Sequence, residues 1–212
     1  MQDLTPQDIQ ALFTRADGSY FFARWGRPLA PVIFGVEDAS LPVIKGAIEA
    51  VATLGRLEIV EVDPELGANL MVFFCRDWAE LSDVPNLDKL VPDLDPLVAR
   101  LNQADANQYR TFRFDDAGAI RAAFVFLRMD AALGALSADA LALGQAVQTL
   151  LLWSDGAFAK WSPLGEIADG RVVVRPEIAA LIRAAYDPVL PAMTQDSSHA
   201  LRLFARSGGD AA

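Results

Sequence analysis

Histidine and cysteine are scarce in this chain of 212 residues, with one of each. A catalytic zinc site takes three protein ligands from His, Glu, Asp or Cys, so a zinc peptidase is disfavoured and we expect no metal or other cofactor. No internal disulfide can form. We expect Cys75, which lies in an apolar run, to be a small buried hydrophobe rather than a nucleophile. His199 follows Ser197 and Ser198, but nothing in the sequence brings a Ser-His-Asp triad together.

Positive charge and long apolar runs are also lacking. The chain has 18 basic and 28 acidic residues, a net charge of -10, and only three lysines, Lys45, Lys89 and Lys160. Nucleic acids and anionic membrane surfaces reward clustered Lys and Arg, so both are disfavoured as partners. The hydrophobic fraction is 53%, yet no uninterrupted apolar run reaches the roughly 18 residues of a membrane span. These features predict a soluble, densely packed protein.

A secretory signal is not visible at the N-terminus, which has no basic region followed by an apolar one. We therefore expect a cytoplasmic protein, or a periplasmic one whose leader has been removed. The length predicts one domain over residues 1–212, with residues 1–18 as a short N-terminal helical extension. The sequence does not predict the oligomeric state.

What the chain does have is an unusually apolar segment, residues 137–153, which predicts a central helix. Ser137 with Asp139 suits the N-terminal cap. The helix has almost no polar face and should be buried on most sides. Gly144, Gln145 and Gln148 break its apolar surface, and positions 144 and 148 point the same way.

These interruptions have the spacing of the zinc motif H-E-x-x-H, in which two histidines bind the metal and the glutamate acts as base. In that frame Gly144 and Gln148 replace the histidines and Gln145 the glutamate, while Ser154 falls on the later position of the extended motif. None is a conventional zinc ligand. The run 144–156, G-Q-A-V-Q-T-L-L-L-W-S-D-G, resembles the segment E-E-x-T-Q-x-L-G-L-x-N-D-S of an uncharacterised bacterial family with a zincin-like (metallopeptidase-like) fold.

Two other segments are similar to the same family. Residues 176–194 resemble its tail, L-x-x-L-Y-D-P followed by G-M-T, and Arg24-Trp25 with Pro28 resemble its opening. The resemblance covers roughly residues 24–203. It implies a zincin-like fold with a cleft beside the central helix. Because this chain has Gly144 and Gln145 where the family has acidic or His residues, and Ala192 in place of a glycine, it also implies a degenerate site without catalysis.

Hydrophobic periodicity and turn residues predict the other elements. Helices are expected at 5–16, 40–54, around 97–101, 176–186 and around 200–204, and strands at 31–36, 57–62, 69–75, 109–114, 120–129 and 171–175. Residues 19–25 pair as a strand or wrap the core as a loop, and residues 77–107 form loops and short helices. The sum is an α+β fold, with a mixed sheet, then a buried central helix, then a helical C-terminal part.

The first functional hypothesis is a non-catalytic, zincin-like pseudoenzyme that binds a peptide or protein. An extended peptide would add to the 109–129 hairpin by β-augmentation. The ligand-binding positions would be those of the degenerate motif: Gly144, Gln145, Gln148, Ser154 and Asp155.

Three other interpretations stay open. A metal-independent hydrolase would use acidic residues such as Asp155 and Glu166, facing one cleft, as acid and base. Alternatively, the apolar surplus is an oligomer interface, which light scattering would test. In the least specific interpretation, Gln145 and Gln148 only satisfy buried polar groups under the loop 154–156, and Asp155 forms a turn or a cap.

Overall fold

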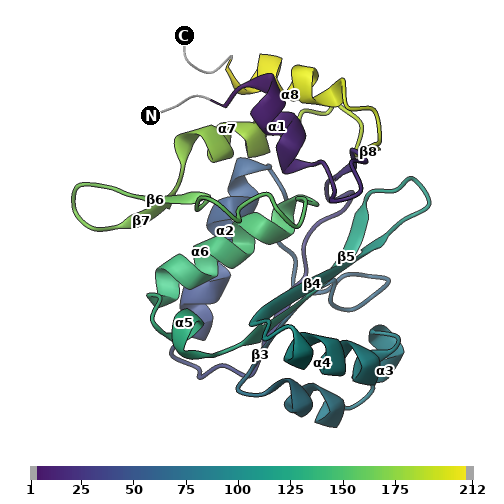
Figure 1. The fold of residues 1–212 in the computed structure, drawn as a ribbon, viewed down its shortest axis with the longest axis vertical. Coiled ribbons are helices and arrows are strands. Elements are labelled where there is room, and N and C mark those ends of the chain that lie inside the picture. Colours follow the sequence, from purple (N-terminus) through teal and green to yellow (C-terminus); the bar gives the residue numbers. More distant parts are fainter. Residues whose placement is uncertain (1–3, 209–212) are drawn as a thin grey trace.

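A four-stranded mixed sheet lies at the centre of the molecule (Figure 1). The computed structural model describes residues 4–208, so residues 1–3 and 209–212 of the predicted domain lie outside the described part. The strands, in spatial order, are β2 (Pro31–Phe34), β3 (Leu70–Cys75), β5 (Ile120–Arg128) and β4 (Gln108–Phe114). The first three are parallel and β4 is antiparallel to β5. The predicted α+β class with a mixed sheet is confirmed, and β4 is an edge strand.

Helices cover both faces of this sheet (Figure 1). One face carries α2 (Leu41–Leu54) and α6 (Ala138–Leu150), which pack against each other and enclose the larger core. The other face carries a smaller core under three short elements, η1 (Trp78–Asp83), α3 (Leu87–Leu90) and α4 (Leu94–Gln103). The short helices expected in residues 77–107 are therefore confirmed, and α6 is the predicted central helix.

The remaining elements surround these layers. They are α1 (Pro6–Leu12), β1 (Phe22–Ala23), α5 (Ala131–Gly134), β6 (Leu164–Glu166), β7 (Val172–Val174), α7 (Pro176–Ala185), β8 (Met193–Thr194) and α8 (His199–Ser207). β1 pairs with β8, and β6 forms a hairpin with β7. Figure 1 shows α1, α7 and α8 together at one end of the molecule. No helix in the described part of the chain is long and apolar enough to cross a membrane.

Several predicted bounds were wrong, and one predicted strand is absent from the described chain. The N-terminal helix ends at Leu12 rather than Ala16. The predicted strand 57–62 is reduced to a single parallel bridge between Leu29 and Ile59. Leu29 bonds both Glu58 O and Val60 N, but Pro31 has no N–H with which to extend the ladder.

The central helix begins as predicted and ends earlier. The Ser137 side chain accepts a hydrogen bond from the Ala140 amide at 3.2 Å, which is an N-cap. At the other end, Leu151 leaves the helix in an extended conformation and bridges Arg24. The helix therefore stops at Leu150, not at Trp153.

Aromatic donors take the place of a glycine cap at this C-terminal end. The last four carbonyls of a helix have no partner inside it. Here Trp153 Nε1 donates to Val147 O at 2.9 Å. Trp25 Nε1 donates to Thr149 O at 2.8 Å, and Tyr186 Oη donates to Leu150 O at 2.7 Å. These three bonds fix where the end of α6 lies.

A row of aromatic rings across the sheet fixes the register of β4. Phe34, Phe73, Phe126 and Tyr109 lie on successive neighbouring strands, with stacked centroids 4.7, 5.1 and 6.4 Å apart. Tyr109 thus faces the smaller core. Because side chains alternate along a strand, Gln108, Arg110 and Phe112 face α6.

Candidate functional site

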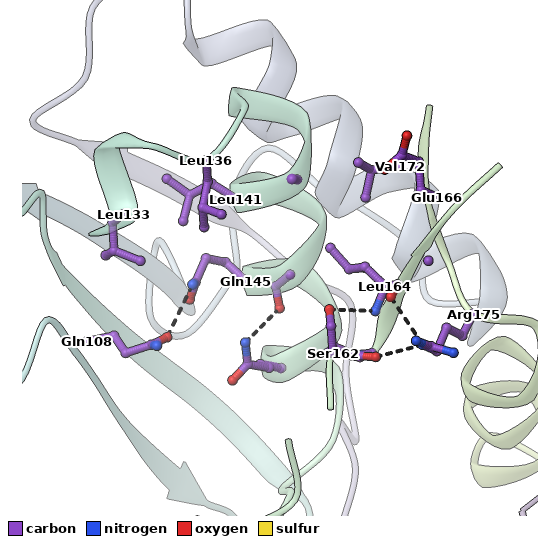
Figure 2. Close-up of a pocket in the computed structure, with 15 residues that line it drawn as sticks. Gln108, Leu133, Leu136, Leu141, Gln145, Ser162, Leu164, Glu166, Val172 and Arg175 are labelled. Carbon is purple, nitrogen blue, oxygen red and sulfur yellow. Dashed lines mark hydrogen bonds between the residues drawn. The ribbon is translucent and has the colours of Figure 1, made fainter. Parts of the chain in front are cut away.

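A cleft lies between β4, α6 and the β6–β7 hairpin, and we call it the β4 cleft. It consists of two adjoining pockets with volumes of about 420 and 730 Å³. Both are lined by Gln108 of β4, Gln148 of α6, and the Ser162-Pro163 segment that leads into β6. Figure 2 shows the smaller pocket, with Gln108 on one side of α6 and Ser162, Leu164 and Arg175 on the other.

The free edge of β4 borders this cleft. Arg128 N donates to Asn107 O at 2.8 Å, and the register then alternates along the β4–β5 pair. In an antiparallel pair every second residue bonds its partner strand, and the residues between direct their N–H and C=O outward. The outward residues are Gln108, Arg110 and Phe112, the same three whose side chains face α6.

Polar side chains join β4 to the middle of α6. Gln145, which is buried, accepts a short hydrogen bond from Arg110 Nη2 and donates from Nε2 to Gln108 Oε1 at 3.3 Å. Arg110 Nη2 also donates to Gln108 Oε1 at 2.8 Å. Gln148 Nε2 bonds Gly144 O within its own helix at 3.2 Å. The partners of both glutamines therefore lie on β4 and α6, not in the loop 154–156.

Arg110 is a cation without a carboxylate partner. It forms no ion pair with any of residues 4–208, and its buried Nε has no hydrogen-bond partner there. Burial lowers the pKa of its guanidinium to about 10, so the group still carries its charge at neutral pH. Uncharged amide oxygens are its only hydrogen-bond acceptors in the described chain.

Aromatic rings form the wall of the larger pocket opposite β4. Trp153 and Phe158 meet edge to face at 5.0 Å, and Phe158 and Trp161 meet in the same way at 5.4 Å. All three line the pocket. In the smaller pocket, Arg175 lies on the hairpin side, where its Nε donates to Ser162 O at 2.8 Å and to Leu164 O at 3.2 Å (Figure 2).

The degenerate-motif residues all line the cleft. Gly144, Gln145 and Gln148 line the smaller pocket, and Gln148, Ser154 and Asp155 line the larger. Ser154 also contacts α1, because its amide donates to Leu12 O at 2.8 Å and its hydroxyl to Ala11 O at 3.3 Å.

The two carboxylates of the hydrolase hypothesis line different pockets. Asp155 lines the larger pocket and Glu166 the smaller. A shared proton or water would need both groups to reach the same reacting atoms. The pocket linings do not provide that arrangement.

The residues at the zinc-motif positions do not fit zinc. Zinc takes imidazole, thiolate or carboxylate ligands, and positions 144, 145, 148 and 154 hold Gly, Gln, Gln and Ser. Gln145 is bonded to the cationic Arg110, which would repel a metal ion. Among residues 4–208 no group of three or more His, Cys, Asp and Glu could hold a metal ion.

Sequence reasoning missed Arg110 and Gln108. The signal that could have found them is the pattern Q-Y-R-T-F-R-F in residues 108–114. It alternates like a strand and places an arginine in line with apolar Phe112. The sequence did not show that this face is turned toward α6.

The two scarce residues lie away from the cleft. Cys75 is buried, and burial raises the pKa of its thiol to about 11, so the expected buried hydrophobe is confirmed. His199 is only 2% exposed, and its ring centroid lies 4.4 Å from that of Phe22. Neither of its ring nitrogens has a hydrogen-bond partner among the described residues.

Comparison of the chain with protein-family models, curated proteins and solved structures finds no match.

Proposed function

We propose that the protein is a non-catalytic, zincin-like pseudoenzyme, and that the β4 cleft binds an extended segment of a peptide or protein. The observation that carries the proposal is the free edge of β4 beside the cleft. Gln108, Arg110 and Phe112 have their backbone N–H and C=O groups at the free edge of the sheet, and their side chains lie on the adjoining face, where they line the larger pocket. A peptide strand added there would gain main-chain hydrogen bonds and side-chain pockets together.

Chemistry at the degenerate-motif positions supports binding over catalysis. The glutamine amides at 145 and 148 can donate and accept hydrogen bonds but cannot act as a general base. The aromatic wall of Trp153, Phe158 and Trp161 offers apolar surface for peptide side chains. The fold around the cleft, with a mixed sheet and a buried helix beside an edge strand, is compatible with the zincin-like resemblance.

A proline on the edge tests this proposal. Gln108→Pro removes one outward N–H at the first residue of β4, a position where an edge strand tolerates proline. Gln108→Ala is the matched control, because it removes the same side chain and keeps the N–H. The probe is a library of hexapeptides with both ends capped, and the readout is the fluorescence of the tryptophans in the cleft.

We expect Gln108→Pro to lose at least tenfold more affinity than Gln108→Ala for every peptide that the parent protein binds. Unfolding in urea, followed in parallel, checks that both variants fold. Equal affinities of the two variants would contradict addition of a strand to β4. No binding of any peptide to the parent protein would contradict the peptide-binding function itself.

A further inference from the structure

We infer that the β4 cleft selects ligands that carry a carboxylate, and that the guanidinium of Arg110 binds it. The inference rests on the proposed function, because it names the chemical class of the peptide. A peptide strand lying along β4 would place a side chain opposite Arg110, where an Asp or Glu would pair with it. The carboxylate at a free peptide C-terminus has the same chemistry.

The first argument is the missing counter-ion. A cation taken out of water is costly unless it is paired and hydrogen-bonded. Arg110 has Gln108 and Gln145 as neutral acceptors, yet no carboxylate in the described chain lies within ion-pair distance, and its Nε is left unbonded. Asp155 lines the same pocket without forming an ion pair with Arg110. A ligand carboxylate at Nη1 would supply the counter-ion that the described chain does not, whereas the buried Nε is closed to a ligand.

The second argument is that the two amides hold the guanidinium in place. An arginine whose planar group is already held in place loses less side-chain freedom when it binds a carboxylate. Gln108 and Gln145, from two different elements, both bond Nη2. That leaves the bonding capacity of Nη1, which has no hydrogen-bond partner among residues 4–208.

The aromatic wall adds a second requirement to the ligand. Side chains on one face of a strand recur every second residue. If an acidic side chain meets Arg110, a side chain two positions away on the same face lies further along the cleft, where Trp153, Phe158 and Trp161 line it. The preferred peptide therefore has an acidic residue and, two positions from it, an apolar one.

The experiment compares three probe sets: capped hexapeptides with Glu at one position, the same peptides with Gln there, and uncapped peptides with a free C-terminal carboxylate. N-acetylphenylalanine serves as a carboxylate fragment without strand structure. Each is titrated into the parent protein, Arg110→Gln and Gln145→Glu. Arg113→Gln is the matched control for the loss of a β4 charge. The Arg113 guanidinium lies over Phe124 and bonds Leu90 O, Thr111 Oγ1 and the Phe112 carbonyl at the edge, so the variant can change the affinity for every peptide but should not change the preference for Glu over Gln.

We expect the Glu peptides to bind at least tenfold more tightly than their Gln counterparts. Arg110→Gln should abolish this preference and Arg113→Gln should keep it. Gln145→Glu retains Arg110 but gives it an internal carboxylate, so it should abolish the preference too. A preference confined to uncapped peptides would assign the contact to the C-terminal carboxylate.

The outcomes separate the inference from the proposed function. Equal binding of Glu, Gln and uncapped peptides would overturn the inference and leave the peptide function standing. Failure of all peptides, with N-acetylphenylalanine binding in an Arg110-dependent way, would overturn the peptide function and keep the carboxylate site. No binding of any probe would overturn both.

Discussion

The C-terminal end and the middle of α6 differ in how fully the polar groups there are paired. At the C-terminal end, three aromatic donors satisfy the carbonyls of Val147, Thr149 and Leu150. In the middle, beside β4, Gln145 meets a guanidinium that has no counter-ion and an unbonded Nε. Both stretches belong to the same helix and the same core.

Unbonded buried nitrogens also occur outside the cleft, in His199 and at the Nε of Arg24, Arg121 and Arg128, so what distinguishes Arg110 is a missing counter-ion beside a pocket. Buried polar groups are nearly always hydrogen-bonded, and the exceptions call for an explanation. The C-terminal end follows this rule, as expected of a part that only holds the fold. The middle breaks it where a cleft of two pockets opens. We interpret the unmatched cation as part of a binding site, and the following changes test that contrast.

The largest loss of stability should come from removing a hydrogen-bond donor at the C-terminal end of α6. Trp25 is 1% exposed, and its Nε1 donates to Thr149 O. Trp25→Phe leaves that carbonyl without a donor and creates a small cavity, and we expect a loss of about 3 kcal/mol in the free energy of unfolding. Gln148→Ala, on the cleft side, should cost less than about 0.5 kcal/mol. Urea unfolding measures the loss of stability in each variant. Equal losses would contradict the difference between the C-terminal end and the middle of α6.

His199 tests whether an unmatched buried group must belong to a site. Burial, and secondarily Arg202, lower its pKa to about 4 from 6.5, with Asp196 opposing. Between those values the unfolded chain binds a proton that the folded chain does not, so stability is full above pH 6.5 and falls as the pH drops toward 4. From pH 7 to 4.5 we expect this group to remove about 2 kcal/mol.

The measurement compares urea unfolding of the parent protein and His199→Leu at pH 7 and 4.5. The variant should lose less stability over this range, by the stated amount. Parallel pH profiles would mean that His199 does not stay neutral in the folded chain. Peptide binding at pH 7 should be the same in both proteins, because His199 lies outside the β4 cleft.

A carboxylate introduced beside Arg110 should pair the unmatched cation in the middle of α6 and stabilise the fold. Gln145→Glu places a carboxylate against Arg110 in nearly the same volume, and we expect a gain of about 1 kcal/mol at pH 7. The gain should disappear as the pH falls through the lowered pKa of the new carboxyl. In an Arg110→Gln background it should be absent, which a double-mutant cycle tests. A gain that persists without Arg110 would contradict the pairing.

The smallest effect concerns the open space beside α6. A Cβ at Gly144 would meet only Leu164 Cδ1, at 3.7 Å, an ordinary contact. Gly144→Ala should therefore raise the free energy of unfolding by about 0.5 kcal/mol through helix propensity. Gly46→Ala in α2, where a Cβ meets nothing within 4 Å, is the matched control. A loss of stability at 144 alone would mean that the pocket there is closed.

Features that depend on neighbouring residues could be predicted from the sequence, whereas features that depend on contacts between distant residues could not. The N-cap of α6 and the β4–β5 hairpin follow from nearby residues such as Ser137 and the turn at 115–118. The end of α6 depends on Trp25, which is 124 positions away from its carbonyl acceptor. Residues 57–62 are rich in Leu, Ile and Val and were predicted as a strand, yet Pro31 has no N–H with which to extend a ladder beyond the bridge at Ile59. The role of Arg110 could not be predicted, because its partner Gln145 lies 35 positions later in the chain.

The most direct test is amide hydrogen exchange of β4 with and without a Glu-containing hexapeptide. In the free protein, the amides of Gln108, Arg110 and Phe112 should exchange quickly, and those of Tyr109 and Thr111 slowly, because only the latter bond β5. The peptide should slow the three outward amides at least tenfold. Unchanged exchange at all three, under conditions where the peptide is bound, would contradict strand addition at the β4 cleft.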